Sequence, residues 1–203
     1  MKRSGSYRYV HTSVYGVEDL DDYGSWGTAA GYGPVWYPRV EVGWSPYSYG
    51  RWVWVDWYGW TWVGYEPWGW APYHHGRWLF SGRGWGWCPG PVLYSAWSPA
   101  LVGFFGWGRH SGIGVGFGFG NLGWVPLAPG EAFYPWYGRG YYGRGGNVVV
   151  NNVNVTNVNI TNVYRNAGVN GALRGGNVQD FGDRKSTRLN SSHIQKSRMP
   201  SSA

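Results

Sequence analysis

Few residues in the chain have the types and spacing that catalysis or metal binding requires. His74 and His75 are adjacent, Glu66 lies eight residues before His74, and Cys88 follows thirteen residues after His75. Adjacent residues of a strand point to opposite faces, so the two histidines are not expected to share a metal ion. We therefore interpret them as a structural or surface pair.

The other reactive side chains indicate neither a nucleophile nor an acid/base couple. Cys88 precedes a Pro-Gly pair at an expected turn, and no histidine is placed to activate its thiol. Asp56 lies in another expected turn and Glu66 precedes a proline, and nothing in the sequence pairs the two carboxylates. We expect a protein that is not an enzyme and that has no cofactor and no metal.

Aromatic side chains and glycine dominate the composition instead. The chain has 17 Trp, 17 Tyr and 36 Gly among its 203 residues. Between residues 16 and 146, no stretch of nine residues lacks both glycine and proline, and either residue is costly inside a helix. The composition excludes helical bundles, coiled coils and transmembrane proteins, and we expect no helix between residues 16 and 146.

Three copies of a unit of about 26 residues follow one another, over 23–48, 49–74 and 75–100. Each copy has a Gly-X-Trp triplet, then a second tryptophan at a nearly fixed offset, and then a Trp-X-Pro triplet. A fixed period of this length indicates tandem structural units. The tryptophans at these positions are Trp26, Trp52 and Trp78, then Trp36, Trp62 and Trp87, and then Trp44, Trp70 and Trp97.

Each copy is predicted to form a β-hairpin followed by an extended segment. In the second copy, strands are expected at 51–55 and 60–63, because aromatic and β-branched residues dominate both segments. Asp56 and Gly59 stand at the first and fourth positions of an expected type I turn between them. We therefore expect an all-β domain over 16–137, in which the three hairpin repeats pack into one Trp-rich twisted sheet or small barrel.

Comparison of the copies separates expected core residues from a candidate ligand surface. The tryptophans of the hairpins recur in every copy, which suits packing in the core. Trp54, Trp57 and Trp68 are not matched by tryptophan in the first copy. Together with Tyr65 they are the candidate ligand-binding residues of an exposed aromatic platform. The alternative is that these rings fill a larger core in the central copy.

The aligned units resemble a bacterial Trp/Pro-rich family of unknown function. Motifs at 33–38, 50–55, 67–74 and 123–127 carry the resemblance, which extends from about residue 7 to 164. Members of that family are typically envelope or exported proteins, often with a FecR-like domain upstream. The resemblance implies a location in the periplasm, at the cell surface or outside the cell. It also implies that a signal peptide and an upstream domain are missing here, and it assigns no catalytic or ligand-binding residue.

The two ends of the chain depart from the repeat pattern. Residues 1–15 are interpreted as a truncated approach segment, because no apolar stretch of a signal peptide follows the basic start; the alternative is a cytoplasmic protein. Residues 138–146 are an expected Gly/Arg linker, and 147–182 are an expected Asn/Val/Thr-rich extended tail that self-associates through its strand edges. Residues 183–203 resemble a translated sequencing adapter, and without them +3 of the formal charge of +7 remains.

Two functions of different classes fit these features. The first is a non-catalytic module of the cell envelope, structural or binding, that contacts cell-wall polysaccharide or peptidoglycan through exposed aromatic rings. The second is a single-stranded nucleic-acid-binding protein, in which aromatic rings stack on bases and arginines contact phosphates. The small remaining charge favours the first function.

Overall fold

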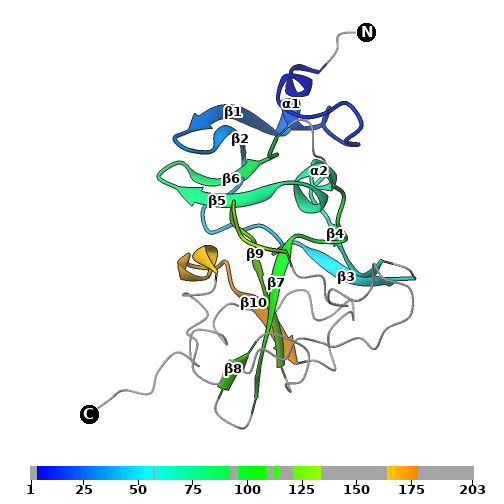
Figure 1. The fold of residues 1–203 in the computed structure, drawn as a ribbon, viewed down its shortest axis with the longest axis vertical. Coiled ribbons are helices and arrows are strands. Elements are labelled where there is room, and N and C mark those ends of the chain that lie inside the picture. Colours follow the sequence, from blue (N-terminus) through cyan, green and yellow to red (C-terminus); the bar gives the residue numbers. More distant parts are fainter. Residues whose placement is uncertain are drawn as a thin grey trace.

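The chain forms an all-β fold in a computed structural model that describes residues 4–56, 58–91, 96–108, 112–114, 121–133 and 164–177 (Figure 1). Within these residues, all strand pairs are antiparallel and no sheet closes into a barrel. The sheets have the strand orders β1-β2-β6-β5, β10-β9-β7-β8 and β3-β4. The strands are β1 (Gly24–Ala29), β2 (Gly33–Pro38), β3 (Gly50–Val55), β4 (Gly59–Gly64), β5 (Arg77–Ser81), β6 (Gly84–Cys88), β7 (Val102–Gly108), β8 (Gly112–Gly114), β9 (Asn121–Pro126) and β10 (Arg174–Asn177). Four short helices complete the described elements: η1 (Gly5–Arg8), α1 (Leu20–Tyr23), α2 (Trp70–His74) and η3 (Arg165–Gly168).

Hairpins form at the three predicted positions, as β1–β2, β3–β4 and β5–β6. In each hairpin, the two recurrent tryptophans are direct cross-strand partners: Trp26 with Trp36, Trp52 with Trp62, and Trp78 with Trp87. The glycine that begins each second strand has a positive φ, of 76° at Gly33, 76° at Gly59 and 90° at Gly84. A left-handed glycine at this point lets the chain enter the returning strand without strain.

The recurrent Gly-X-Trp triplet has a steric basis. A Cβ added to Gly24 would lie 2.4 Å from an atom of the Trp36 indole, and one added to Gly50 would lie 2.5 Å from the Trp62 indole. The glycine therefore makes room for the indole ring that is the cross-strand partner of the tryptophan in its own triplet. A side chain at either position would displace that ring.

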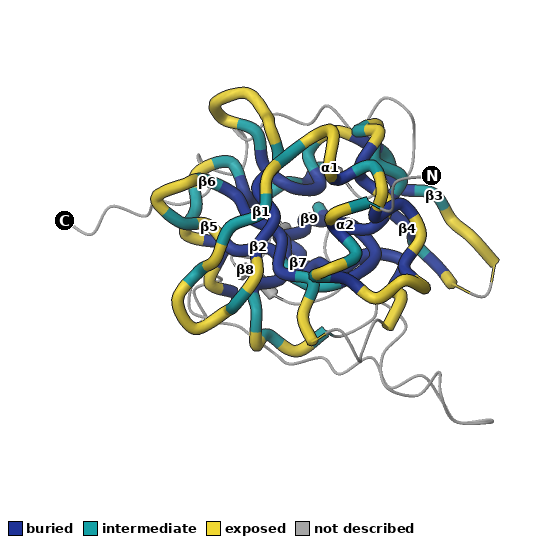
Figure 2. The backbone as a smooth tube through the Cα atoms, turned by 90° about the horizontal axis from the view of Figure 1, so that it is seen from above, coloured by how far each residue is buried: buried dark blue, intermediate teal, exposed yellow. Residues whose placement is uncertain are grey.

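The three hairpins do not share one sheet, which differs from the expectation of a single sheet or small barrel. The first and third hairpins join through β2 and β6, so tryptophans 26, 36, 87 and 78 form a row across four strands. The second hairpin stands apart as β3–β4, and Trp52 packs on Trp124 of β9 and Phe104 of β7, at ring distances of 5.5 and 5.1 Å. Seen from above, the buried strands lie inside and the exposed turns outside (Figure 2).

Two of the short helices contradict the expectation that residues 16–146 contain no helix. α1 and α2 are single turns of four and five residues. Pro72 lies in the first turn of α2, where backbone N–H groups have no partner within the helix, so a proline costs little there. The Trp-X-Pro triplet at 70–72 is therefore helical rather than extended. No helix in the described part of the chain is long and apolar enough to cross a membrane.

Part of the segment expected to be an exposed tail belongs to the fold. Within 164–177, β10 pairs with β9, and Tyr164 is buried against Gly103 of β7. The Asn166 side-chain amide donates to the carbonyls of Trp78 and Pro126, at 2.9 Å each. The linker at 138–146, the Asn/Val/Thr repeats at 147–163 and the adapter-like residues 183–203 lie outside the described residues.

Replacement of either tryptophan in the β3–β4 pair should destabilise the protein far more than loss of a neighbouring exposed ring. Trp52 and Trp62 are fully buried, so Trp→Ala at either site should lower the free energy of unfolding by about 3–5 kcal/mol. Trp54 lies on the same face of the hairpin but is 48% exposed, and its replacement by alanine should cost much less. Urea denaturation of the three variants would measure the difference, and equal losses would contradict this division between core and surface.

Candidate functional site

The four candidate ligand residues occupy different environments. Trp54 and Tyr65 are each 48% exposed, and Trp57 lies outside the described residues. Trp68 is only 3% exposed, so its assignment to an exposed platform is wrong. Its ring packs in the centre of the core, against Trp36 and Trp44 at 5.0 and 5.6 Å. Absence of tryptophan from another copy of the unit therefore did not indicate a surface position.

The two exposed candidates do not share a surface. Trp54 lies near the turn of the β3–β4 hairpin, where its ring contacts Trp60 at 5.5 Å and its Nε1 donates to Asp56 at 3.2 Å. Tyr65 lies beyond the open end of the hairpin and contacts Tyr49 at 5.1 Å. A six-residue strand separates the ends by roughly 17 Å. Asp56 lies at the turn of this hairpin and Glu66 lies beyond its open end. The structure therefore does not bring these two carboxylates together.

A row of exposed aromatic rings covers α2 and its neighbours. The sequence did not mark these rings as candidates for ligand binding. Tyr15 contacts Trp70 at 6.3 Å, and Tyr58 contacts Trp97 at 4.8 Å. Between these two pairs lies the buried ring of His74, 4.4 Å from Trp70 and 5.5 Å from Trp97. The exposed fractions are 73% for Tyr15, 46% for Trp70, 36% for Trp97 and 51% for Tyr58. We call these four rings the aromatic strip.

Hydrogen bonds between α2 and residues 96–99 hold the strip together. Ser98 donates its backbone N–H to the carbonyl of His74 at 2.9 Å, and His74 Nδ1 lies 2.7 Å from the carbonyl of Ser98. The next residue, Pro99, accepts from the backbone N–H of Trp62 at 3.0 Å. Trp97 is thus fixed beside α2 by its own neighbours in the chain. The sequence marked Trp70 and Trp97 as recurrent residues of the Trp-X-Pro triplets but assigned them neither to the core nor to a ligand surface.

The centre of the strip carries no charge at neutral pH. Burial lowers the pKa of His74 from 6.5 to about 4, and burial also lowers the pKa of His75. Both histidines are buried at the end of α2 rather than on a strand. Among the described residues, no group of three or more His, Cys, Asp or Glu side chains is placed to hold a metal ion.

A concave surface surrounds Glu66, in a groove of about 940 Å³ that Arg39, Glu41, Trp44 and Tyr49 also line. Glu66 Oε1 accepts from Trp44 Nε1 at 3.0 Å and from the Tyr73 hydroxyl at 2.7 Å. Its Oε2 is buried and has no hydrogen-bond partner among the described residues. Burial outweighs these hydrogen bonds and raises the pKa of Glu66.

Cys88 has the properties of a structural thiol. Its side chain is buried at the end of β6, and burial raises the pKa of the thiol to about 12. A thiol is nucleophilic only as the thiolate, so Cys88 stays in the unreactive form at neutral pH.

Matching of the chain to protein-family models identifies a family of unknown function, DUF6600, over residues 17–131. The match covers more than half of the chain, and the chain belongs to this family. No curated protein and no solved structure matches the chain.

Acid should destabilise the strip through His74. The unfolded chain binds a proton on this residue near pH 6.5 and the folded chain only near pH 4, so stability falls as the pH decreases between these values. The loss should reach up to about 3 kcal/mol, from about 1.4 kcal/mol for each unit of pKa difference. His74→Phe keeps a stacked ring but cannot titrate. Urea unfolding at pH 7 and pH 4 should therefore show a smaller pH dependence for His74→Phe than for the wild type; an unchanged dependence would contradict this assignment.

Glu66 should have the opposite pH dependence. Its pKa is raised by folding, so its contribution to stability is largest at low pH and is lost as the pH rises through the folded pKa. Glu66→Gln keeps an acceptor oxygen and removes the charge. The melting temperature of this variant relative to wild type should therefore be higher at pH 8 than at pH 4. Glu41→Gln, which removes one exposed carboxylate from the same groove, is the matched control for the loss of a negative charge there.

Proposed function

We propose that this member of the family is a non-catalytic binding module of the bacterial cell envelope that contacts glycans through the aromatic strip. The observation that carries the proposal is the row of exposed rings beside α2. Sugar rings have apolar C–H faces, which stack on aromatic rings. Because α2 and residues 96–99 fix Trp70 and Trp97 in place, binding would order few side chains and lose little conformational entropy.

The charge of the strip supports an uncharged ligand over a nucleic acid. Its four rings are Tyr and Trp, and the buried His74 between them is neutral above its pKa of about 4. Nucleic-acid affinity depends largely on Lys and Arg that neutralise phosphates. Among the described residues, the arginine that stacks on an aromatic ring is Arg83, whose guanidinium carbon lies 4.1 Å from the centre of the Tyr37 ring. Arg83 lies in the β5–β6 turn, on the opposite side of the molecule from α2 (Figure 1).

The proposed location rests on the resemblance to Trp/Pro-rich envelope proteins. Cell-wall polysaccharide and peptidoglycan are then the glycans that the strip would meet in the periplasm, at the cell surface or outside the cell. Both present long runs of sugar rings. Several rings in a row suit such a polymer better than a single small sugar, because successive sugars can contact successive aromatic side chains.

Removal of a strip ring should weaken retention on glycans without unfolding the protein. We expect Trp70→Ala and Trp97→Ala each to lower the affinity for peptidoglycan or cell-wall polysaccharide about tenfold, the effect of losing roughly 1.4 kcal/mol of contact. Retention of the wild type should survive a rise from 50 to 200 mM salt, because no phosphate or carboxylate contact is involved. Co-sedimentation with the purified polymers measures both effects.

The control is Tyr23→Ala, which removes a 40% exposed ring on α1, outside the strip. It should leave retention unchanged, and melting curves should show that all variants fold. Absence of retention on every glycan tested would overturn the proposal in favour of a structural role. Tight binding to single-stranded DNA or RNA that falls steeply with salt would overturn it in favour of nucleic-acid binding.

A further inference from the structure

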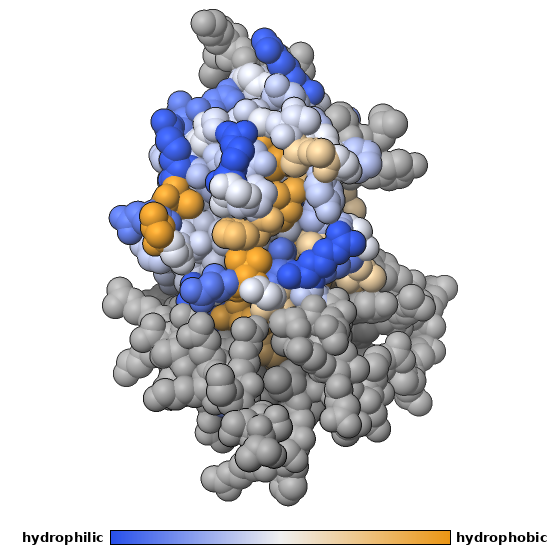
Figure 3. Space-filling model, turned by 90° about the vertical axis from the view of Figure 1, so that its left-hand side faces the viewer, coloured by the Kyte–Doolittle hydropathy of each residue, from blue (hydrophilic) through white to orange (hydrophobic). Residues whose placement is uncertain are grey.

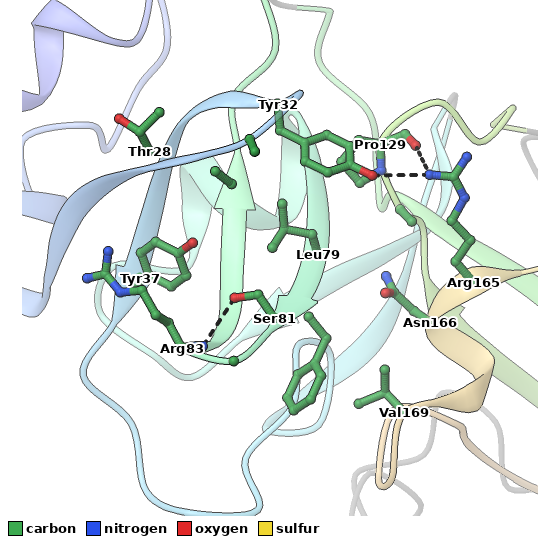
Figure 4. Close-up of a pocket in the computed structure, with 15 residues that line it drawn as sticks. Thr28, Tyr32, Tyr37, Leu79, Ser81, Arg83, Pro129, Arg165, Asn166 and Val169 are labelled. Carbon is green, nitrogen blue, oxygen red and sulfur yellow. Dashed lines mark hydrogen bonds between the residues drawn. The ribbon is translucent and has the colours of Figure 1, made fainter.

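A groove of about 520 Å³ lies on the side of the molecule opposite α2 (Figure 1). It runs between the turns of the β1–β2 and β5–β6 hairpins and the segment that follows β9. Residues 28–32 of the β1–β2 hairpin and 79–83 of the β5–β6 hairpin form one part of it. Residues 128–129 and 165–169 form the other (Figure 4). Segments more than 80 residues apart in sequence thus meet at this groove. We call it the arginine groove, after Arg83 and Arg165.

Arg83 is fixed in position although it is exposed. Its guanidinium carbon lies 4.1 Å above the centre of the Tyr37 ring. Its Nη1 also lies 2.3 Å from where a Cβ of Gly27 would be, so the missing side chain of Gly27 leaves the space that the guanidinium uses. Stacking on a ring leaves the N–H edge of a guanidinium available for an anion. Arg83 is therefore already oriented for binding.

Arg165 is oriented by one residue from each part of the groove. Its Nη1 donates to the Tyr32 hydroxyl at 3.3 Å and to the carbonyl of Pro129 at 3.4 Å, both of them neutral acceptors (Figure 4). The neighbouring carboxylate of Glu131 is engaged elsewhere. It accepts from the backbone N–H groups of Arg165 at 2.6 Å and Ala128 at 2.8 Å.

The lining of the arginine groove is cationic at its borders and apolar between them. It includes two arginines and no acidic residue, whereas the groove around Glu66 includes two glutamates. Phe80 and Val169 supply apolar surface, and the buried cluster that contains Tyr37 and Leu79 lies beneath. Figure 3 faces this side of the molecule and shows apolar residues next to strongly hydrophilic ones.

We propose that the arginine groove binds an organic anion whose carboxylates pair with Arg83 and Arg165 and whose uncharged body lies on the apolar surface between them. Guanidinium and carboxylate groups match in shape and form two parallel hydrogen bonds. Neither arginine is satisfied by a carboxylate among the described residues, so the ligand would supply the missing charge. The site is separate from the aromatic strip and does not depend on its function.

The test uses the full chain and an oligogalacturonate, in which carboxylates alternate with uncharged sugar-ring bodies. Isothermal titration should show binding that weakens as salt rises, and an uncharged oligogalactoside of equal length should not bind. Arg83→Met and Arg165→Met should each lower the affinity about tenfold. Arg83→Lys keeps the charge but not the planar fork, so it should give an intermediate affinity.

Arg8→Met is the matched control, because it removes one exposed arginine from η1, outside the groove. An equal loss of affinity in this variant would show attraction by net charge alone and overturn the proposal. No measurable binding of the oligogalacturonate, equal binding of the uncharged sugar, or tighter arginine-dependent binding of single-stranded DNA would also overturn it. Trp70→Ala should leave this binding unchanged, which separates the result from that of the aromatic strip.

Discussion

Hydrogen bonds from buried indole N–H groups tie the segments between strands to the core of this protein. Each buried tryptophan brings one donor into the core, and a donor left without a partner there costs about 1–3 kcal/mol. Strand carbonyls are already used in the ladders, so the acceptors come from the segments between strands. Trp36 donates to Leu20, Trp78 to Pro72, Trp87 to His75 and Trp124 to Tyr47, all to backbone carbonyls at 2.8–3.1 Å.

Two of these hydrogen bonds also fix the position of Trp70 in the aromatic strip. The indoles of Trp78 and Trp87 hold the carbonyls of Pro72 and His75, near the end of α2. With these two carbonyls directed into the core, the first residue of the helical turn, Trp70, points outward. Trp70 is thus placed by the buried rings, whereas Trp97 is placed by the hydrogen bonds between His74 and Ser98.

The hairpins could be predicted from the sequence because their causes are local. Strand alternation, a turn glycine and a Gly-X-Trp triplet recur within 26 residues, and each has a steric reason. The strip could not be predicted, because Trp68 and Trp70 are the same residue type, and only the single turn of α2 decides which is buried. The arginine groove could not be predicted from the sequence for another reason. Arg83 and Arg165 line the same groove only because the segment after residue 164 returns to pair with β9.

Several glycines are required by the same aromatic core. An indole or phenol ring that lies flat across a neighbouring strand needs a position without a side chain beneath it. Besides the triplet glycines, Gly103 would place a Cβ 2.3 Å from Tyr164, Gly123 one 2.4 Å from Phe105, and Gly64 one 2.4 Å from Tyr73. Glycine normally weakens a strand, but at these three positions a ring covers the glycine and shields the backbone from water. Abundant glycine beside abundant tryptophan is therefore the composition of a tightly packed core in this fold, whereas glycine without aromatic partners is typical of flexible linkers.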